Sequence, residues 1–233
     1  MNISIILSGG VGSRMGLDTP KQYIEVGGHP IFWYCLKTFL ESPAIDAIVI
    51  GRSDEWSGYI CSQIDSFDTL KPIYFSQPGE TRQYSIYNAL LEARRHGIKQ
   101  EDVVIIHDAA RPLVSQELIV SCIEGCDEAD GVLPVIPVKD TLYQSVDGRH
   151  ITNLLNRNEL FAGQAPEAFR FGKYLALHEQ MPREELLKIN GSTEIAYKGG
   201  LKIKLIEGDV MNFKITTPED LTSFETIINQ RNR

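Results

Sequence analysis

The sequence predicts an α/β fold in which a mostly parallel sheet is flanked by helices and carries a projecting β-arm. Short apolar runs recur along the chain, and segments with apolar residues at helical spacing lie between them. Strands that are apolar at every position are typical of parallel sheets, because helices cover both faces of such a sheet. A further observation, the turn dipeptide Asp147-Gly148 between two short β-like segments, predicts the arm.

The expected elements alternate along the first part of the chain. The apolar runs expected to form strands are Ile3–Leu7, Ala47–Gly51, Ile73–Phe75, Val103–His107 and Gly131–Ile136. The helices expected between them are Ile31–Leu40, Tyr84–Arg95 and Leu118–Cys126. Pro30 suits the first position of its helix, and Ser115 suits the N-cap of another.

The rest of the chain departs from this alternation. Segments 141–146 and 150–153 flank Asp147-Gly148 and are expected to form a tight hairpin, within an arm over about residues 138–157. Thr217-Pro218-Glu219-Asp220 is typical of a helix start, and the helix after it would present Leu221, Phe224, Ile227 and Ile228 on one face. No linker or repeat divides the chain, so residues 1–233 are expected to form one domain.

Composition and charge restrict the class of protein. The formal net charge of −8 disfavours a nucleic-acid surface, which would show a basic stripe. No apolar run approaches the ~20 residues that cross a bilayer, and the N-terminus does not resemble a signal peptide, so we expect a cytoplasmic protein without a membrane segment. Cys122 and Cys126 have no histidine cluster beside them, which favours core packing over zinc binding.

The first expected strand leads into Ser8-Gly9-Gly10-Val11-Gly12-Ser13-Arg14, with Lys21 shortly after it. Glycines let backbone N–H groups approach a phosphate closely, and Arg14 and Lys21 supply positive charge. The spacing fits neither the dinucleotide fingerprint G-x-G-x-x-G nor the phosphate loop G-x-x-x-x-G-K-[ST]. The segment therefore predicts a nucleotide site of another kind. The alternative, a tight turn without a ligand, leaves the two cations unexplained.

A second segment, His107-Asp108-Ala109-Ala110-Arg111-Pro112, follows the fourth apolar run. Both segments come at the C-terminal ends of expected strands, where open α/β sheets bind ligands. There Asp108 can hold Mg²⁺ together with substrate phosphates, and Arg111 can bind a phosphate bidentately. The alternative is that Asp108 caps a turn and Arg111 forms a surface ion pair. An acidic enzyme that binds a nucleotide needs a local group of cations, for which the candidates are Arg14, Lys21, Arg82 and Arg111.

On these two segments together, the chain resembles the methylerythritol-phosphate and ribitol-phosphate cytidylyltransferases. The resemblance implies a Rossmann-like sheet of the nucleotide-diphospho-sugar transferase type. Further matches run collinearly along the chain: Gly79-Glu80-Thr81-Arg82-Gln83-Tyr84-Ser85, Val138-Lys139-Asp140-Thr141, Asn156-Arg157, Gly163-Gln164-Ala165-Pro166-Glu167-Ala168-Phe169, Asn212-Phe213-Lys214-Ile215-Thr216 and Pro218-Glu219-Asp220-Leu221.

The resemblance implies a CTP-dependent reaction in which the phosphate of a phosphorylated sugar alcohol attacks the α-phosphorus of CTP and pyrophosphate leaves. It implies catalytic roles for Arg14, Lys21 and Lys214, and a role for Asp108 as a ligand of the Mg²⁺ cofactor. The residues implied to bind the nucleotide are Leu7, Ser8, Gly9, Gly10, Gly12, Ser13, Gly79, Arg82, Ser85, Asp108 and Ala109. Those implied to bind the second substrate are Arg111, Thr141, Arg157 and Lys214, with Arg157 supplied by the neighbouring subunit of a homodimer that the arm forms.

Two departures from the family pattern concern the second substrate. The family commonly shows Q-T-P-Q where this chain has Gln164-Ala165-Pro166-Glu167, and a T-D pair where it has Ser192-Thr193-Glu194 before a shortened helix. A carboxylate near an anionic substrate repels it, so Glu167 either points away or recognises polyol hydroxyls or a substrate amine. The acceptor stays open between methylerythritol phosphate of isoprenoid biosynthesis, ribitol 5-phosphate, and another wall or capsule phosphoalcohol.

Alternatives remain for single residues and for the whole chain. Instead of binding substrate, Arg82 could pair with Glu80 or Glu92 in a structural role. Lys214 could be an ordinary exposed residue of an expected strand. A CTP-binding module without turnover would be expected to have lost at least one of the charged residues. A hydride-transferring dinucleotide enzyme lacks the last glycine of its fingerprint.

Overall fold

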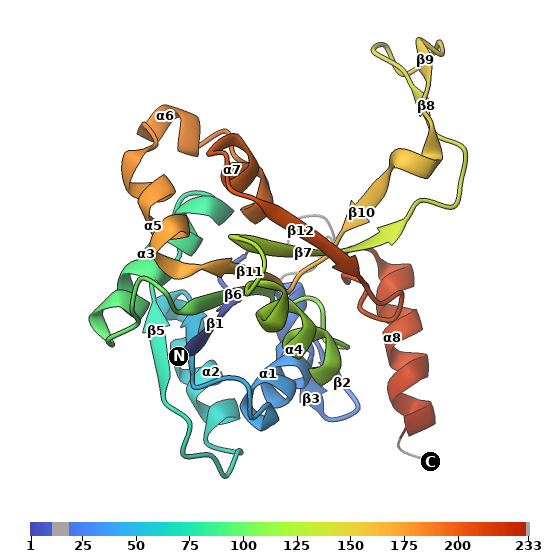
Figure 1. The fold of residues 1–233 in the computed structure, drawn as a ribbon. Coiled ribbons are helices and arrows are strands. Elements are labelled where there is room, and N and C mark those ends of the chain that lie inside the picture. Colours follow the sequence, from blue (N-terminus) through green and yellow to red (C-terminus); the bar gives the residue numbers. More distant parts are fainter. Residues whose placement is uncertain (11–18, 232–233) are drawn as a thin grey trace.

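The computed structural model describes residues 1–10 and 19–231, and a central sheet organises them (Figure 1). The strands of this sheet are β1 (Asn2–Leu7), β4 (Ala47–Gly51), β5 (Ile73–Ser76), β6 (Val103–Asp108), β7 (Gly131–Pro137), β10 (Phe161–Gly163), β11 (Glu167–Arg170) and β12 (Ile203–Glu207). Their order is β10-β7-β11-β6-β1-β4-β5, and β12 pairs with β7. All five expected strands are confirmed, whereas β10, β11 and β12 were not predicted.

Parallel pairing brings the carboxyl ends of the central strands to one edge. β1 lies between β4 and β6 and is parallel to both, and β4 is parallel to β5. Leu7 is in register with Gly51 on one side and with Asp108 on the other. The loops that follow β1, β4 and β6 therefore start side by side. β11 runs antiparallel between β6 and β7 and so begins at this same edge.

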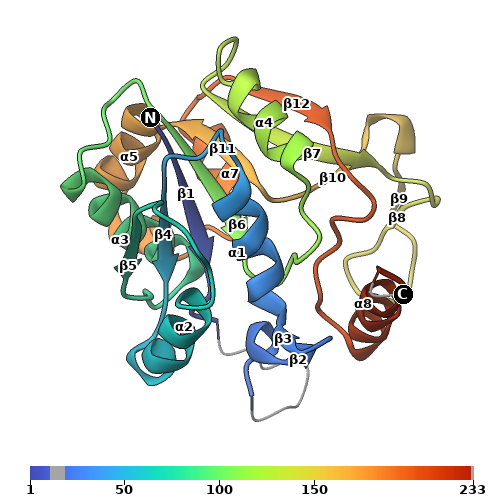
Figure 2. The ribbon, with the colours of Figure 1, turned by 90° about the horizontal axis from the view of Figure 1, so that it is seen from below.

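Helices cover both faces of the sheet (Figure 2). One apolar cluster joins the sheet to α1 (Ile31–Glu41), α2 (Ser57–Ile64) and α4 (Gln116–Gly125). A second cluster joins it to α3 (Arg82–Arg95), α5 (Phe171–Gln180), α6 (Arg183–Leu186) and α7 (Ser192–Lys198). Fully buried rings such as Phe39 in the first cluster and Phe169 in the second contribute about 1.5–3 kcal/mol each. The three-layer α/β prediction is confirmed.

Hydrogen bonds at the helix ends agree with the sequence signals. Ser115 Oγ accepts from Leu118 N at 3.2 Å, as expected for the N-cap of α4. At α8 (Pro218–Arg231), Asp220 Oδ2 accepts from the backbone N–H groups of Thr216 and Thr217, both at 2.8 Å. The apolar face of α8 packs in a third cluster with the strand pair β2 (Glu25–Val26) and β3 (His29–Pro30) and the start of α1. Pro30 precedes α1 instead of opening it, so that expectation was off by one residue.

The arm projects from the end of β7 and returns through β10 (Figure 1). It contains a ladder of two short strands, β8 (Tyr143–Gln144) and β9 (Asn153–Leu154), in which residue 144 pairs with residue 153. The expected tight turn is therefore wrong, because residues 145–152 form a longer loop. Asp147 organises this loop by accepting backbone hydrogen bonds from Arg149 and His150. Gly148 has φ +70°, which explains the glycine signal.

None of the helices in the described part of the chain combines the length and the apolar composition needed to span a membrane. Within residues 1–10 and 19–231, the remaining regular elements are three short 3-10 helices, over Lys21–Tyr23, Asp54–Trp56 and Arg157–Glu159. The first of these follows the glycine segment and packs its Tyr23 ring on Trp56, with ring centroids 4.4 Å apart. This stacking ties the 3-10 helix Lys21–Tyr23 to the segment after β4.

We expect two buried histidines to make stability fall in mild acid. Burial lowers the pKa of His107 and of His178 to about 4, whereas an unfolded histidine titrates near 6.5. Between these values the unfolded chain binds more protons than the folded one, so the free energy of unfolding decreases as pH falls from about 6.5 to about 4. Urea unfolding at several pH values measures this slope. In His178→Gln the slope should shrink by about 1.4 kcal/mol per pH unit, and an unchanged slope would contradict the assignment.

Candidate active site

A cavity of about 570 Å³ opens at the edge where the parallel strands end. It is bounded by the segments that follow β1, β4, β5 and β6, as expected for an open α/β sheet. The residues that line this first cavity are Leu7, Gly9, Gly10, Lys21, Gln22, Gly51, Ser53, Pro78, Gly79, Glu80, Thr81, Arg82, Ser85, Asp108, Ala109, Ala110, Lys214 and Thr216. Most of the described residues predicted to bind the nucleotide are thus brought together.

Two glycines are required by close packing in the wall of this cavity. A Cβ on Gly79 would lie 2.3 Å from Tyr84 Cβ, and one on Gly9 would lie 2.8 Å from Pro78 Cβ. The Gly79 N–H donates to Ser85 Oγ at 2.9 Å, and that hydroxyl donates to Thr81 O at 3.0 Å. The Ser85 hydroxyl therefore fixes the turn before α3, and backbone forms much of the surface that a ligand would meet.

Gln22 fixes the described end of the glycine segment. Its Nε2 donates to Ser8 O at 2.8 Å and to Gly10 O at 2.7 Å, and the Tyr23 hydroxyl donates to Ser8 O at 2.8 Å. Burial raises the pKa of Tyr23, so its hydroxyl keeps its proton. Ser8 itself is buried behind the cavity wall. The sequence assigns no role to Gln22, although it belongs to the stretch Pro20-Lys21-Gln22-Tyr23 that follows the glycine segment.

Asp108 forms the centre of a buried charge cluster with Arg82 and Lys214. Its Oδ1 accepts from Arg82 Nε at 3.2 Å and Nη2 at 3.0 Å, and its Oδ2 accepts from Lys214 Nζ at 2.9 Å. Burial alone would raise the pKa of Asp108, but attraction to Arg82 and Lys214 outweighs it and holds the pKa far below its usual range. Asp108 is therefore ionised, and its side chain binds cations instead of capping a turn.

The structure corrects two of the sequence alternatives. Lys214 lies in an irregular segment between β12 and α8 and not in a strand. This segment docks on the loop after β6, where Ile215 N donates to Ala110 O at 2.9 Å and Arg111 Nη1 donates to Asn212 O at 2.8 Å. The carboxylates suggested as partners of Arg82 bind elsewhere: Glu80 pairs with Arg183, and Glu92 pairs with Arg95.

A second cavity of about 310 Å³ adjoins the first. The two cavities share Arg82, Asp108 and Lys214 as lining residues. The other residues of the second cavity are Arg111, Leu133, Gly163, Gln164, Ala165, Glu167, Asn190, Gly191, Thr193 and Glu194. Because Glu167 lines this cavity, the alternative in which it points away is excluded.

Several predicted residues are not brought to these cavities. Thr141 and Arg157 are exposed on the arm and line neither cavity, and Arg157 Nη1 donates to Lys139 O at 2.9 Å. Gly12, Ser13 and Arg14 lie outside the described residues. The roles assigned to these five residues remain predictions.

The described residues provide few ligands for a metal ion. In residues 1–10 and 19–231 no group of three or more His, Cys, Asp and Glu side chains is arranged to hold a metal. Asp108 is the last residue of β6, and both of its oxygens already bind cations. This donor set fits Mg²⁺ only where the phosphates of a bound nucleotide supply most of the ligands, a mode that Mg²⁺ commonly adopts.

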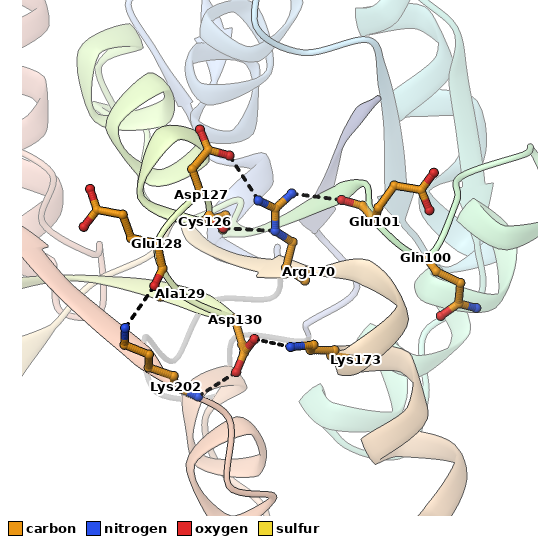
Figure 3. Close-up of a pocket in the computed structure, with 10 residues that line it drawn as sticks. All are labelled: Gln100, Glu101, Cys126, Asp127, Glu128, Ala129, Asp130, Arg170, Lys173 and Lys202. Atoms are coloured by element: carbon orange, nitrogen blue, oxygen red, sulfur yellow. Dashed lines mark hydrogen bonds and ion pairs between the residues drawn. The ribbon is translucent and has the colours of Figure 1, made fainter.

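A third hollow, at the opposite edge of the sheet, is built from mutually satisfied charges (Figure 3). Arg170 bonds Asp127 and the carbonyl oxygens of Cys126 and Glu101. Lys173 pairs with Asp130 at 2.5 Å. These bonds join the starts of β6 and β7 to the end of β11, so we assign this hollow a structural role.

A family model described as IspD: 2-C-methyl-D-erythritol 4-phosphate cytidylyltransferase matches residues 2–230. The chain belongs to this family. Membership confirms the resemblance seen in the sequence and makes the chain a cytidylyltransferase, an enzyme of the nucleotidyltransferase class.

Two curated relatives of this IspD-family chain have different named activities. A 2-C-methyl-D-erythritol 4-phosphate cytidylyltransferase of Clostridium botulinum (strain Eklund 17B / Type B) is 34% identical over 227 residues, which cover 97% of this chain and 99% of that protein. A ribitol-5-phosphate cytidylyltransferase of Streptococcus agalactiae serotype Ia is 31% identical over 232 residues, which cover 99% of this chain and 97% of that protein. Because the two names differ in the acceptor, similarity alone leaves the acceptor open.

Solved structures of IspD-family proteins share the fold. The 2-C-methyl-D-erythritol 4-phosphate cytidylyltransferase of Francisella tularensis superposes with a TM-score of 0.78 at 26% identity, over 97% of this chain and 98% of that one. The 4-diphosphocytidyl-2C-methyl-D-erythritol synthase of Anaerococcus prevotii superposes with a TM-score of 0.81 at 24% identity, over 98% and 96%. The predicted fold class is therefore confirmed for the whole chain.

We expect Gln22→Leu to impair use of the nucleotide while the chain still folds. The change removes two hydrogen bonds that join the carbonyl oxygens of Ser8 and Gly10 to one donor, and the loss of two such bonds costs about 1–3 kcal/mol. The kcat/KM for CTP should fall about 10- to 100-fold. Steady-state kinetics measure it, with Gln77→Leu as the control, because the side chain of exposed Gln77 bonds Asp54 and no other residue in the described part of the chain. Equal kinetics in the two variants would contradict the role of Gln22.

Proposed function

We propose that this chain transfers the cytidylyl group of CTP to the phosphate of a phosphorylated sugar alcohol. An oxygen of the acceptor phosphate forms a bond to the α-phosphorus, the bond from that phosphorus to the departing pyrophosphate breaks, and the products are a CDP-alcohol and pyrophosphate. The observation that carries the proposal is the pair of adjoining cavities with Arg82, Asp108 and Lys214 in both linings. Two anionic substrates placed in these cavities would meet at this cluster.

The chemistry of such a reaction suits the charge of the site. The attacking group is already an anion, so no base has to remove a proton from it. What remains is to align two anions and to stabilise negative charge at the α-phosphorus, for which fixed positive groups are effective. Asp108 holds Lys214 in place before any substrate arrives, and Lys21 lines the same cavity. We propose catalytic roles for these two lysines, together with Arg14.

We propose that the first cavity binds CTP and that the second binds the acceptor. Backbone at Gly9, Gly10 and Gly79 would approach the nucleotide, with Leu7, Ala109 and Ser85 beside it. Arg111 would bind the acceptor phosphate from the second cavity. Asp108 would hold Mg²⁺, which when bound supplies positive charge to the phosphates.

We propose further that the whole chain is a single domain and that two copies form a cytoplasmic homodimer. The dimer forms through the arm over about residues 138–157. The arm exposes large apolar side chains, among them Val146 at 84%, Ile151 at 66% and Leu154 at 61%. Exposed apolar groups clustered on one projecting element favour contact with another copy. All four cysteines are free, which fits a reducing compartment such as the cytoplasm.

We expect Lys21→Ala to lose about 10²- to 10³-fold in kcat, because one preorganised positive group would be missing from the transition state. The assay is pyrophosphate release with CTP and Mg²⁺ across methylerythritol 4-phosphate, ribitol 5-phosphate, glycerol 3-phosphate and phosphorylated amino alcohols. Lys37→Ala is the control, since exposed Lys37 lies over the partly buried Trp33 ring and lines neither cavity. Near-normal turnover in Lys21→Ala would contradict the proposed catalytic role of Lys21.

The same panel tests the reaction itself. Release with one acceptor would establish the activity and name the acceptor. CTP binding without release would favour a silent CTP-binding module or an acceptor outside the panel, and the absence of CTP binding would overturn the proposal.

We expect Arg157 to act on the neighbouring subunit's site. If so, Lys21→Ala and Arg157→Ala are each inactive alone, but a dimer with one subunit of each keeps one intact site. Random mixing should then restore about a quarter of the wild-type activity, because half of the dimers are mixed and each has one working site. No recovery after mixing would place Arg157 at the site of its own chain.

A further inference from the structure

Glu167 faces the second cavity beside Asp108. It opens β11 and pairs in register with Ile106 of β6, so its side chain lies on the same face of the sheet as Asp108. Arg82 Nη2 lies between the two carboxylates, 3.0 Å from Asp108 Oδ1 and 3.6 Å from Glu167 Oε1. Glu167 is 8% exposed. This carboxylate is therefore part of the built wall of the cavity.

Thr193 fixes the Glu167 carboxylate through one of its two oxygens. The backbone N–H and the hydroxyl of Thr193 both donate to Oε2, at 2.8 and 2.6 Å. Oε1 accepts no hydrogen bond from the described residues and has only the longer contact with Arg82. The other carboxylates of this cavity are engaged: Asp108 by Arg82 and Lys214, and Glu194 by Lys198 and Asn190 N. Among the described carboxylates that line this cavity, Glu167 Oε1 is thus the oxygen left to bind a ligand.

The two departures from the family sequence pattern meet at this contact. Glu167 belongs to the segment that replaces Q-T-P-Q, and Thr193 belongs to the segment that replaces the T-D pair. Because the two side chains hydrogen-bond each other, the departures form a single local arrangement. The change also removes a hydroxyl at Ala165, in the lining of the same cavity. The arrangement therefore concerns what this cavity accepts.

The charges of the cavity decide between an amine and a hydroxyl as the partner of Oε1. Three cations, Arg82, Arg111 and Lys214, lie against the carboxylates of Asp108 and Glu167 around the cluster. An acceptor ammonium at Oε1 would stand beside the Arg82 guanidinium and be repelled by it. A hydroxyl donates a hydrogen bond without bringing charge, and hydrogen bonds to charged acceptors are the stronger ones.

We propose that Glu167 is a specificity-determining residue, positioned by Thr193, that selects phosphorylated polyols by accepting a hydrogen bond from one of their hydroxyls at Oε1. Arg111 and Lys214 bind the phosphate end of the same molecule, and Glu167 contacts a hydroxyl on its carbon chain. The inference rests on the proposed function, because it assigns the acceptor to the second cavity.

Glu167→Gln tests the proposal against acceptors that differ by one hydroxyl. The Thr193 N–H needs an oxygen, so the amide of Gln places its NH₂ group where Oε1 was, and the charged acceptor is lost. The experiment compares the best acceptor of the panel with analogues that each lack one hydroxyl. In the wild type, removal of the contacted hydroxyl should lower kcat/KM about 10- to 100-fold. In Glu167→Gln the same removal should cost less than about threefold, with the KM for CTP unchanged within about twofold.

Glu194→Gln is the matched control, since it removes the same charge from the lining of the same cavity but its oxygens already bind Lys198 and Asn190. It should keep the wild-type penalty for the missing hydroxyl. If Glu167→Gln does not fold, Glu167→Asp retains the charge, withdraws it from the cavity and should show the same selective loss.

Three results would overturn the inference: an equal hydroxyl penalty in the wild type and the Glu167 variant, an equal rise in KM for both substrates, or a best acceptor with no hydroxyl. Failure of every acceptor in the wild type would instead refute the proposed function.

Discussion

The ionised carboxylate of Asp108 is the constraint around which the site is built. An unpaired charge in this position would lose several kcal/mol of solvation, so its burial requires cations close by. Those cations come from α3 and from the segment before α8, which are far apart in the sequence. The parallel strands supply the geometry, because the register of β1 and β6 puts Asp108 beside the glycine segment. Charge neutralisation and strand order together bring the end of β6, the start of α3 and the segment before α8 to one point.

The parallel core was readable from the sequence because its strands are buried on both faces and so are apolar throughout. The later strands β10 and β11 were not, since each has a local reason to look irregular. β11 begins with Glu167, whose charge is stabilised by Thr193 from a distant helix, and β10 has three residues, all exposed. The Asp147-Gly148 signal indicated a turn correctly but not its length, because the Asp147 side chain folds a longer loop through its own hydrogen bonds.

In the candidate site, too, some residues could be predicted from the sequence and others could not. Asp108 was predictable as a candidate site residue because it ends an apolar strand at the edge where such sheets bind ligands. Lys214 and Gly79 came from the resemblance, since no local pattern marks them. The partnership of Glu167 with Thr193 was beyond either route, because it depends on a contact between β11 and α7 that only the folded chain defines. Ser8 is buried just after β1, where its hydroxyl donates to the Tyr23 hydroxyl at 3.1 Å, and it does not line the cavity.

The wall shared by the two cavities has a thermodynamic consequence. Arg82 and Lys214 each contact Asp108 and line both cavities, so an anion bound on one side alters the potential felt on the other. Any such effect must be reciprocal: the factor by which a nucleotide changes the affinity for the acceptor equals the factor by which the acceptor changes the affinity for the nucleotide. The ion pairs of a single aspartate would therefore couple the two binding equilibria equally in both directions.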